Sequence, residues 1–151
     1  MKIKSHILSL AILFQFSTAC SGQQEKPADL TPLMHHVKFL AADSLEGRAT
    51  GTPGNAKARN YIVSQFSDHS LQPYGQSYLS AFSFTTSGKN AKRVDGLNII
   101  GWLPGTRQDS AAIVISAHYD HEGIKNGKIY NGADDNASGV AVMLEMARYF
   151  S

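Results

Sequence analysis

The strongest constraint on the fold is a segment near the end of the sequence that is helical in pattern and apolar on almost every side. Residues 137–150 place one set of apolar side chains on a single helix face and a second set opposite it. The first set is Val140, Met143, Leu144 and Ala147, and the second is Val142, Met146 and Phe150. Because such a helix is normally buried between two layers, we expect a layered domain.

The segments before this helix predict further helices and strands. Thr31-Pro32 and Thr52-Pro53 each predict a helix that starts with a threonine cap and a proline in the first turn. Residues 43–52 and 87–96 are polar and predict loops, whereas residues 78–84 alternate as a strand does. The apolar runs 97–103 and 111–117 predict two buried strands that form a hairpin. This order of helices and strands indicates an α/β domain.

The charge balance argues against a nucleic-acid partner. The chain of 151 residues has 14 Lys and Arg against 12 Asp and Glu. Two of the lysines, Lys2 and Lys4, lie in a segment that we expect to be removed, which leaves the remaining chain neutral. No basic stripe is left to follow a phosphate backbone.

Residues 1–20 have the pattern of a secretory signal peptide. Two lysines precede the apolar run 7–16, which is too short to span a membrane, and small residues follow it. Residues 21–30 are polar and predict a tether, so we expect the folded domain to cover residues 31–151. The alternative is a buried first helix of a domain that is not exported.

Cys20 is the single cysteine of the chain, and it stands where the signal pattern ends. This position resembles a bacterial lipobox, whose cysteine is lipidated, although Ser17 stands where that signal usually has leucine. Cleavage by an ordinary signal peptidase after Ala19 is the alternative. We expect an exported protein, anchored by lipid at Cys20 in the periplasm or at the outer membrane, or else secreted.

Candidate metal ligands flank the predicted strand and the apolar helix. His118 and Asp120 follow the run 111–117 directly, with a spacing that places both on one side of an extended chain. Asp135 lies just before the helix, in the string GADDNASG. Imidazole and carboxylate groups suit zinc, and ligands collect at the carboxyl ends of strands in α/β sheets. A simple turn at His118 and a helix cap at Asp135 remain the alternative.

Several motifs together resemble a known family. The strings AHYDH and NGADDNASG are similar to those of the co-catalytic di-zinc exopeptidases, metallopeptidase family twenty-eight. The upstream strings LAADSLEGRATGTPGNAKARNYIVSQF and GLNIIGWLPGT resemble its secreted bacterial members, so the likeness spans about residues 30–151. It implies a three-layer α/β/α fold with a mixed central sheet, and peptide-bond hydrolysis of the aminopeptidase type.

The resemblance also implies roles for matching positions. His118 resembles a ligand of one zinc, Asp135 resembles the aspartate that bridges two zinc ions, and Asp120 resembles the aspartate that orients the histidine. In the family a water between the metals attacks the carbonyl and a glutamate takes its proton. The family also implies a cis peptide bond between Asp135 and Asn136.

The family pattern continues beyond what this sequence contains. The glutamate base and further ligands should follow the last helix, so we expect this chain to be the N-terminal part of a longer enzyme and inactive by itself. Glu145 predicts a surface pair with Arg148 rather than the missing base.

Other polar residues near the motifs have less definite roles. His121 and Glu122 adjoin the site and could reach a metal or the substrate, with solvated loop positions as the alternative. Asp134 could hold a metal ligand in place or cap the helix. Glu46 and Arg48 could pair within their loop. The remaining histidines, His35, His36 and His69, predict solvated positions on helices or at helix ends.

Two other functions share this fold. A glutaminyl cyclase-like acyltransferase keeps one zinc, and a non-catalytic relative would serve as a binding module. The string GADDN favours the peptidase over the cyclase, and the presence of His118, Asp120 and Asp135 argues against the non-catalytic relative.

Overall fold

A computed structural model describes residues 29–106 and 111–151. The expected signal peptide, Cys20 and most of the expected tether lie outside the described residues. The helices are α1 (Thr31–Leu40), α2 (Pro53–Asp68) and α3 (Ser138–Phe150), with the short 3-10 helix η1 (Asp43–Arg48) and the π turn η2 (Ala133–Ala137). None of the helices in this part of the chain has the length and apolar character needed to cross a membrane.

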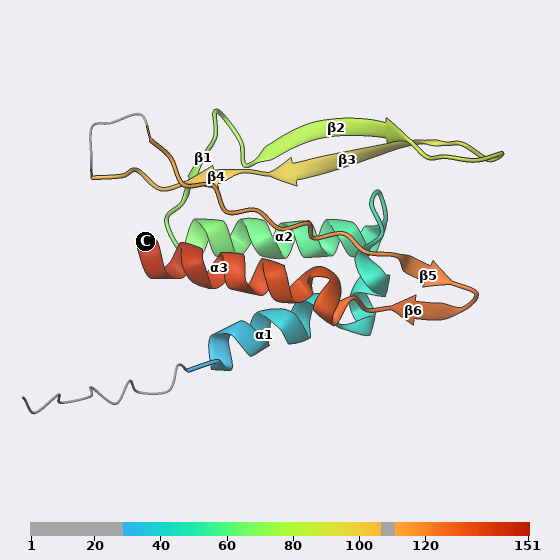
Figure 1. Ribbon diagram of the computed structural model, residues 1–151, viewed down its shortest axis with the longest axis horizontal. Helices are drawn as coiled ribbons and strands as arrows, with labels where there is room; N and C mark the ends of the chain where they lie inside the picture. Colours follow the sequence, from blue (N-terminus) through green and yellow to red (C-terminus); the bar gives the residue numbers. More distant parts are fainter. Residues whose placement is uncertain (1–28, 107–110) are drawn as a thin grey trace, which may run out of the picture.

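The strands of the described residues form three two-stranded antiparallel sheets. The pairs are β1 (Gln72–Pro73) with β4 (Gly101–Trp102), β2 (Leu79–Thr85) with β3 (Arg93–Ile99), and β5 (Gly123–Lys125) with β6 (Lys128–Tyr130). The pair β2–β3 lies over α2 and α3, with α1 below them, while the β5–β6 hairpin projects from one end (Figure 1). The molecule is therefore a layered α/β structure, as expected, and its described strands form antiparallel pairs in place of the expected mixed central sheet.

The helix starts were predicted with mixed success. Thr52 caps α2 as expected, because its hydroxyl accepts a hydrogen bond from the Asn55 amide. The cap of α1 was wrong: Leu30 is its N-cap, Thr31 is its first residue, and the Thr31 amide donates to Asp29. The expected loop 43–52 was also wrong in part, because residues 43–48 form η1.

The expected hairpin of residues 97–103 and 111–117 is not formed. Instead β3 begins at Arg93, inside the expected turn, and pairs with β2 over seven residues. Residues 111–117 have no strand assignment, and Ile113 and Val114 are 93% and 85% exposed. β3 thus has β2 as its antiparallel partner on one edge, and no strand of the described residues pairs with residues 111–117.

The hydrophobic core joins the three helices to η1. Its fully buried members come from each of them: Leu40, Leu45, Ala58, Ile62, Val140 and Leu144. The opposite face of α3 is exposed at Val142 and Phe150. Thus α3 packs on its first apolar face, against α1 and α2, and the second face carries no layer in the described part of the chain.

Candidate metal centre

The end of the extended segment 111–117 and the start of α3 bring three side chains together. The Nε2 of His118 lies 3.1 Å from the Oδ1 of Asp135, and the Nδ1 of His121 lies 3.4 Å from its Oδ2. Asn136 links the same two segments, because its side-chain amide donates to the His118 carbonyl at 3.3 Å. Asp135 therefore faces two imidazoles, one on each of its oxygens.

The turn that carries Asp135 has an unusual backbone. Asp135 and Asn136 depart from helical angles inside η2, and the peptide bond between them is cis, as expected from the resemblance. Gly132, which precedes the turn, has φ 58°. A side chain at this position would meet the imidazole of His121 at 2.6 Å.

Asp120 lies beside His118, but its nearest acceptor is not the carboxylate. The Nδ1 of His118 is 3.1 Å from the main-chain carbonyl of Asp120 and 3.5 Å from the carboxylate Oδ1. The other carboxylate oxygen accepts a hydrogen bond from Thr50. The main chain of Asp120 is therefore the closer partner for orienting the imidazole.

The structure gives different positions to the three candidates with less definite roles. His121 lies at the site, with a side chain that is 12% exposed. Glu122 instead forms an ion pair with Lys125 at 2.9 Å, which lowers the pKa of its carboxyl group. Asp134 is exposed and contributes only its main-chain carbonyl, which accepts from Ser138. The expected capping role of Asp134 is wrong, because α3 has no side-chain cap.

Arg48 does not pair with Glu46, contrary to the hypothesis of a pair within their loop. Its side chain is 1% exposed and donates hydrogen bonds to main-chain carbonyls of the segments that surround the site. The only sequence signal for the buried position of Arg48 is its place in the motif EGRATGTPG.

Glu145 of α3 and His36 of α1 form a second polar cluster. The carboxylate of Glu145 pairs with Arg148 at 2.8 Å as expected, and its other oxygen lies 3.3 Å from the Nε2 of His36. His36 is buried at 5% exposure, so its expected solvated position was wrong. It is buried because Tyr61 and Glu145, from α2 and α3, supply partners for both ring nitrogens.

The donors at the site suit zinc in kind and in spacing. Two ligands of one tetrahedral zinc lie about 3.3 Å apart when each bond is about 2.0–2.1 Å, and the separation of 3.1 Å between His118 and Asp135 agrees. Within residues 29–106 and 111–151, however, no group of three or more potential ligands is arranged around one point. The described residues thus bring together one imidazole and one carboxylate whose spacing is compatible with zinc.

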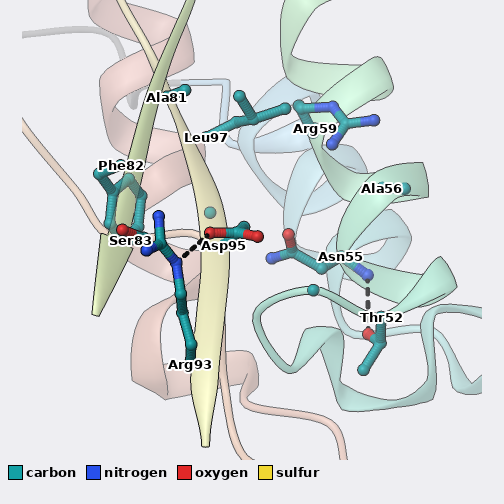
Figure 2. Close-up of a pocket in the computed structure, with 12 residues that line it drawn as sticks. Thr52, Asn55, Ala56, Arg59, Ala81, Phe82, Ser83, Arg93, Asp95 and Leu97 are labelled. Carbon is teal, nitrogen blue, oxygen red and sulfur yellow. Dashed lines mark hydrogen bonds and ion pairs between the residues drawn. The ribbon is translucent and has the colours of Figure 1, made fainter. Parts of the chain in front are cut away.

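One of two cavities in the described residues lies beside this site. A cavity of about 310 Å³ is bordered by His118 and Asp120 and extends over Val140 and Met143 of α3. A larger cleft of about 530 Å³ lies between α2 and the β2–β3 pair (Figure 2). Its only carboxylate, Asp95, is paired with Arg93. Its lining residues offer no second carboxylate or imidazole that could serve as a metal ligand.

The chain is similar to several known proteins. Residues 98–151 match the model of Peptidase family M28. A probable zinc metalloprotease of Pyricularia oryzae is 26% identical over 121 residues, which are 76% of this chain and 24% of that protein. The alkaline phosphatase isozyme conversion protein of Escherichia coli is 27% identical over 158 aligned positions, 96% of this chain and 44% of that protein.

Two further similarities concern proteins of other descriptions. The BOS complex subunit ncln of Danio rerio is 43% identical over 76 residues, 48% of this chain and 13% of that protein. The crystal structure of Fimbriiglobus ruber glutaminyl cyclase has a TM-score of 0.54 at 22% identity, and covers 82% of this chain and 41% of that one. The second similarity shows a shared α/β fold. The chain spans less than half the length of each of these relatives.

Proposed function

We propose that the whole protein is a zinc-dependent exopeptidase of the M28 type, which removes residues from the amino end of peptides. The observation that supports this is the approach of His118 to Asp135 at 3.1 Å. Both residues lie inside the segment that matches the peptidase family. They come from two different elements, so their approach depends on the fold and not on local sequence.

In this proposal His118 and Asp135 would hold zinc, and the two carboxylate oxygens of Asp135 would allow it to serve a second ion as well. The chemistry that zinc supplies when bound is activation of a water and polarisation of the scissile carbonyl. His121 faces the second oxygen of Asp135 and fixes the rotation of the carboxylate. Asp120 keeps the His118 ring in place through its main-chain carbonyl.

Purified whole protein tests the proposal by two measurements. Elemental analysis should find zinc, and a chromogenic aminoacyl substrate should be hydrolysed in a manner that chelation abolishes and added zinc restores. A protein that holds no zinc, or whose hydrolysis survives chelation, would contradict the proposal.

A glutaminyl cyclase-like activity is the second candidate, and the shared fold with the Fimbriiglobus ruber enzyme supports it. A peptide with an amino-terminal glutamine separates the two reactions, because cyclisation releases ammonia without breaking a peptide bond. The third candidate is a non-catalytic subunit, for which the similarity to the BOS complex subunit is the support. That candidate predicts neither reaction.

We further propose that the protein is exported and held at a membrane by a lipid on Cys20. The support is the sequence pattern of residues 1–20 and the polar segment that follows it. An anchored peptidase of this kind would act on peptides outside the cytoplasm.

A further inference from the structure

We propose that Arg48 is a positioning residue of the metal site, which sets the distance between the segment that carries His118 and the turn that carries Asp135. The inference rests on the proposed zinc function and adds a residue to it.

Arg48 is the most deeply buried charged side chain of the described residues, at 1% exposure. It ends η1, and its own backbone has φ 54°, which turns the chain sharply before α2. The main chain at this point is also held by other residues. The carbonyl of Arg48 accepts from the Asn55 side chain at 3.1 Å and from the His121 amide at 3.3 Å.

The guanidinium group bridges the two segments of the site. Its Nε donates to the carbonyl of Tyr119 at 2.9 Å, and Tyr119 lies between His118 and Asp120. On the other side, Nη1 donates to the main-chain carbonyl of Asn131 at 2.6 Å, and Nη2 donates to that of Gly132 at 3.0 Å. Gly132 is the residue before the turn that carries Asp135. The planar fork therefore ties both segments to one rigid group.

A further hydrogen bond anchors this group to the core. Nη1 also donates to the carbonyl of Leu40, which ends α1. Asn131 makes a second connection to the end of α1, because its side-chain amide donates to the Ala41 carbonyl at 2.9 Å. The site is thus held relative to α1 as well as across its own two segments.

The charge of Arg48 suits this place. All its hydrogen-bond acceptors are carbonyl oxygens, and a buried cation is costly without compensation. Burial lowers the pKa of the guanidinium group, and the negative charges of Asp120 and Asp135 oppose that shift. The two carboxylates and Arg48 are therefore coupled through space.

The test compares Arg48→Lys and Arg48→Met with Phe66→Leu in the whole protein. The lysine keeps the charge and loses the planar fork, whereas the methionine loses both. Phe66 is also buried, at 5% exposure, but it packs near Gly101 and Leu71 at the far end of α2. Its replacement should weaken the fold without reaching the site.

Zinc affinity and the visible absorption of the cobalt-substituted protein are the two readouts. Both Arg48 variants should bind zinc about 10–100-fold more weakly, as happens when groups that orient metal ligands are lost. At full cobalt loading their absorption should differ from that of the parent protein, because cobalt absorption reports ligand geometry. Phe66→Leu should lower the melting temperature and leave both readouts unchanged.

Two results would overturn the inference in different ways. Arg48 variants that melt earlier but keep the parent zinc affinity and cobalt spectrum would show Arg48 to be a purely structural residue. If Arg48→Met does not fold, Arg48→Lys decides the question by the same readouts. A parent protein that binds no zinc would overturn the proposed function itself, and this inference with it.

Discussion

The hydroxyl of Thr50 donates a 2.8 Å hydrogen bond to the Oδ2 of Asp120, so the segment that follows η1 holds the carboxylate beside His118. The Oδ1 of the same carboxylate is 3.5 Å from the His118 ring, farther than the main-chain carbonyl of Asp120 at 3.1 Å. Asp120 is thus fixed from one side and acts on His118 largely through its backbone.

We therefore predict that Asp135→Asn costs more activity than Asp120→Asn in the whole enzyme. The first substitution removes a charge that faces His118 and His121 directly. The second leaves the main-chain carbonyl in place, so its cost should be near the lower end of the 10–100-fold range for residues that orient ligands, about tenfold. Steady-state kinetics with a chromogenic aminoacyl substrate measure both. A larger loss for Asp120→Asn would reverse the assigned roles.

Gly47→Ala should destabilise the fold severely. Gly47 has φ 67°, and an added Cβ would lie on the Tyr130 carbonyl oxygen, 2.6 Å from the Gly123 carbonyl oxygen and 2.9 Å from the Gly123 Cα. The backbone cost of about 1–2 kcal/mol adds to an overpacking cost of about 1–3 kcal/mol.

Gly127→Ala is the matched control for this change. Gly127 also has positive φ, 74°, but nothing lies within 4 Å of the added Cβ. It should therefore show only the backbone cost. Denaturant unfolding of both variants measures the difference, and equal destabilisation would mean that the packing of η1 on β5–β6 contributes nothing.

The stability of the protein should fall as the pH drops below about 6.5, partly through His36. Burial lowers the pKa of His36 from its ordinary value of 6.5, although Glu145 opposes this shift. The unfolded chain then binds a proton at a higher pH than the folded chain, so the free energy of unfolding decreases as the pH falls from 6.5 toward the folded pKa. The Tyr61 hydroxyl, 2.6 Å from Nδ1, is the other polar group that faces the ring.

Replacing His36 by glutamine should flatten this part of the pH profile. The control is Lys38→Gln, because Lys38 is exposed on the same helix and is not among the groups that shift the pKa of His36. Chemical unfolding between pH 5 and 7.5 measures the slope. If the slope of His36→Gln equals that of the parent protein, His36 does not contribute to the pH dependence.

The mature N-terminus should be a lipidated Cys20. The single cysteine stands at the end of the signal pattern and before a polar segment. Mass spectrometry of membrane-extracted protein should find the lipid on residue 20. An unmodified thiol there, or an N-terminus upstream of it, would falsify the lipid anchor. Export without an anchor would then be the remaining proposal.

Residues 21–151 expressed alone should be poorly soluble, because Ile113 and Val114 are exposed along a segment without a strand partner in the described residues. The double substitution Ile113→Thr with Val114→Thr should raise the soluble fraction after expression. The control Ile124→Thr changes an exposed residue in the paired strand β5 and should have little effect. A monodisperse parent preparation would contradict this expectation.

The amino-acid sequence by itself determined the elements whose causes are local. The Thr52 cap, the apolar face of α3 and the bounds of β2 each depend on neighbouring residues, and each was predicted within about one residue of its position. The alternation of β2 does not appear as alternating burial, because all seven of its residues are exposed. The positions of His118, Asp120 and Asp135 ahead of α3 were likewise evident from the sequence.

Only the tertiary structure decided the features that join distant segments. Arg48 reaches Tyr119 and Gly132, 71 and 84 residues away, and His36 reaches Glu145, 109 residues away. Whether a polar side chain is solvated or buried depends on whether such partners meet it in space. A buried arginine or histidine is tolerated only where hydrogen-bond partners surround it. The spacing of residues along the chain does not show which distant residues become such partners.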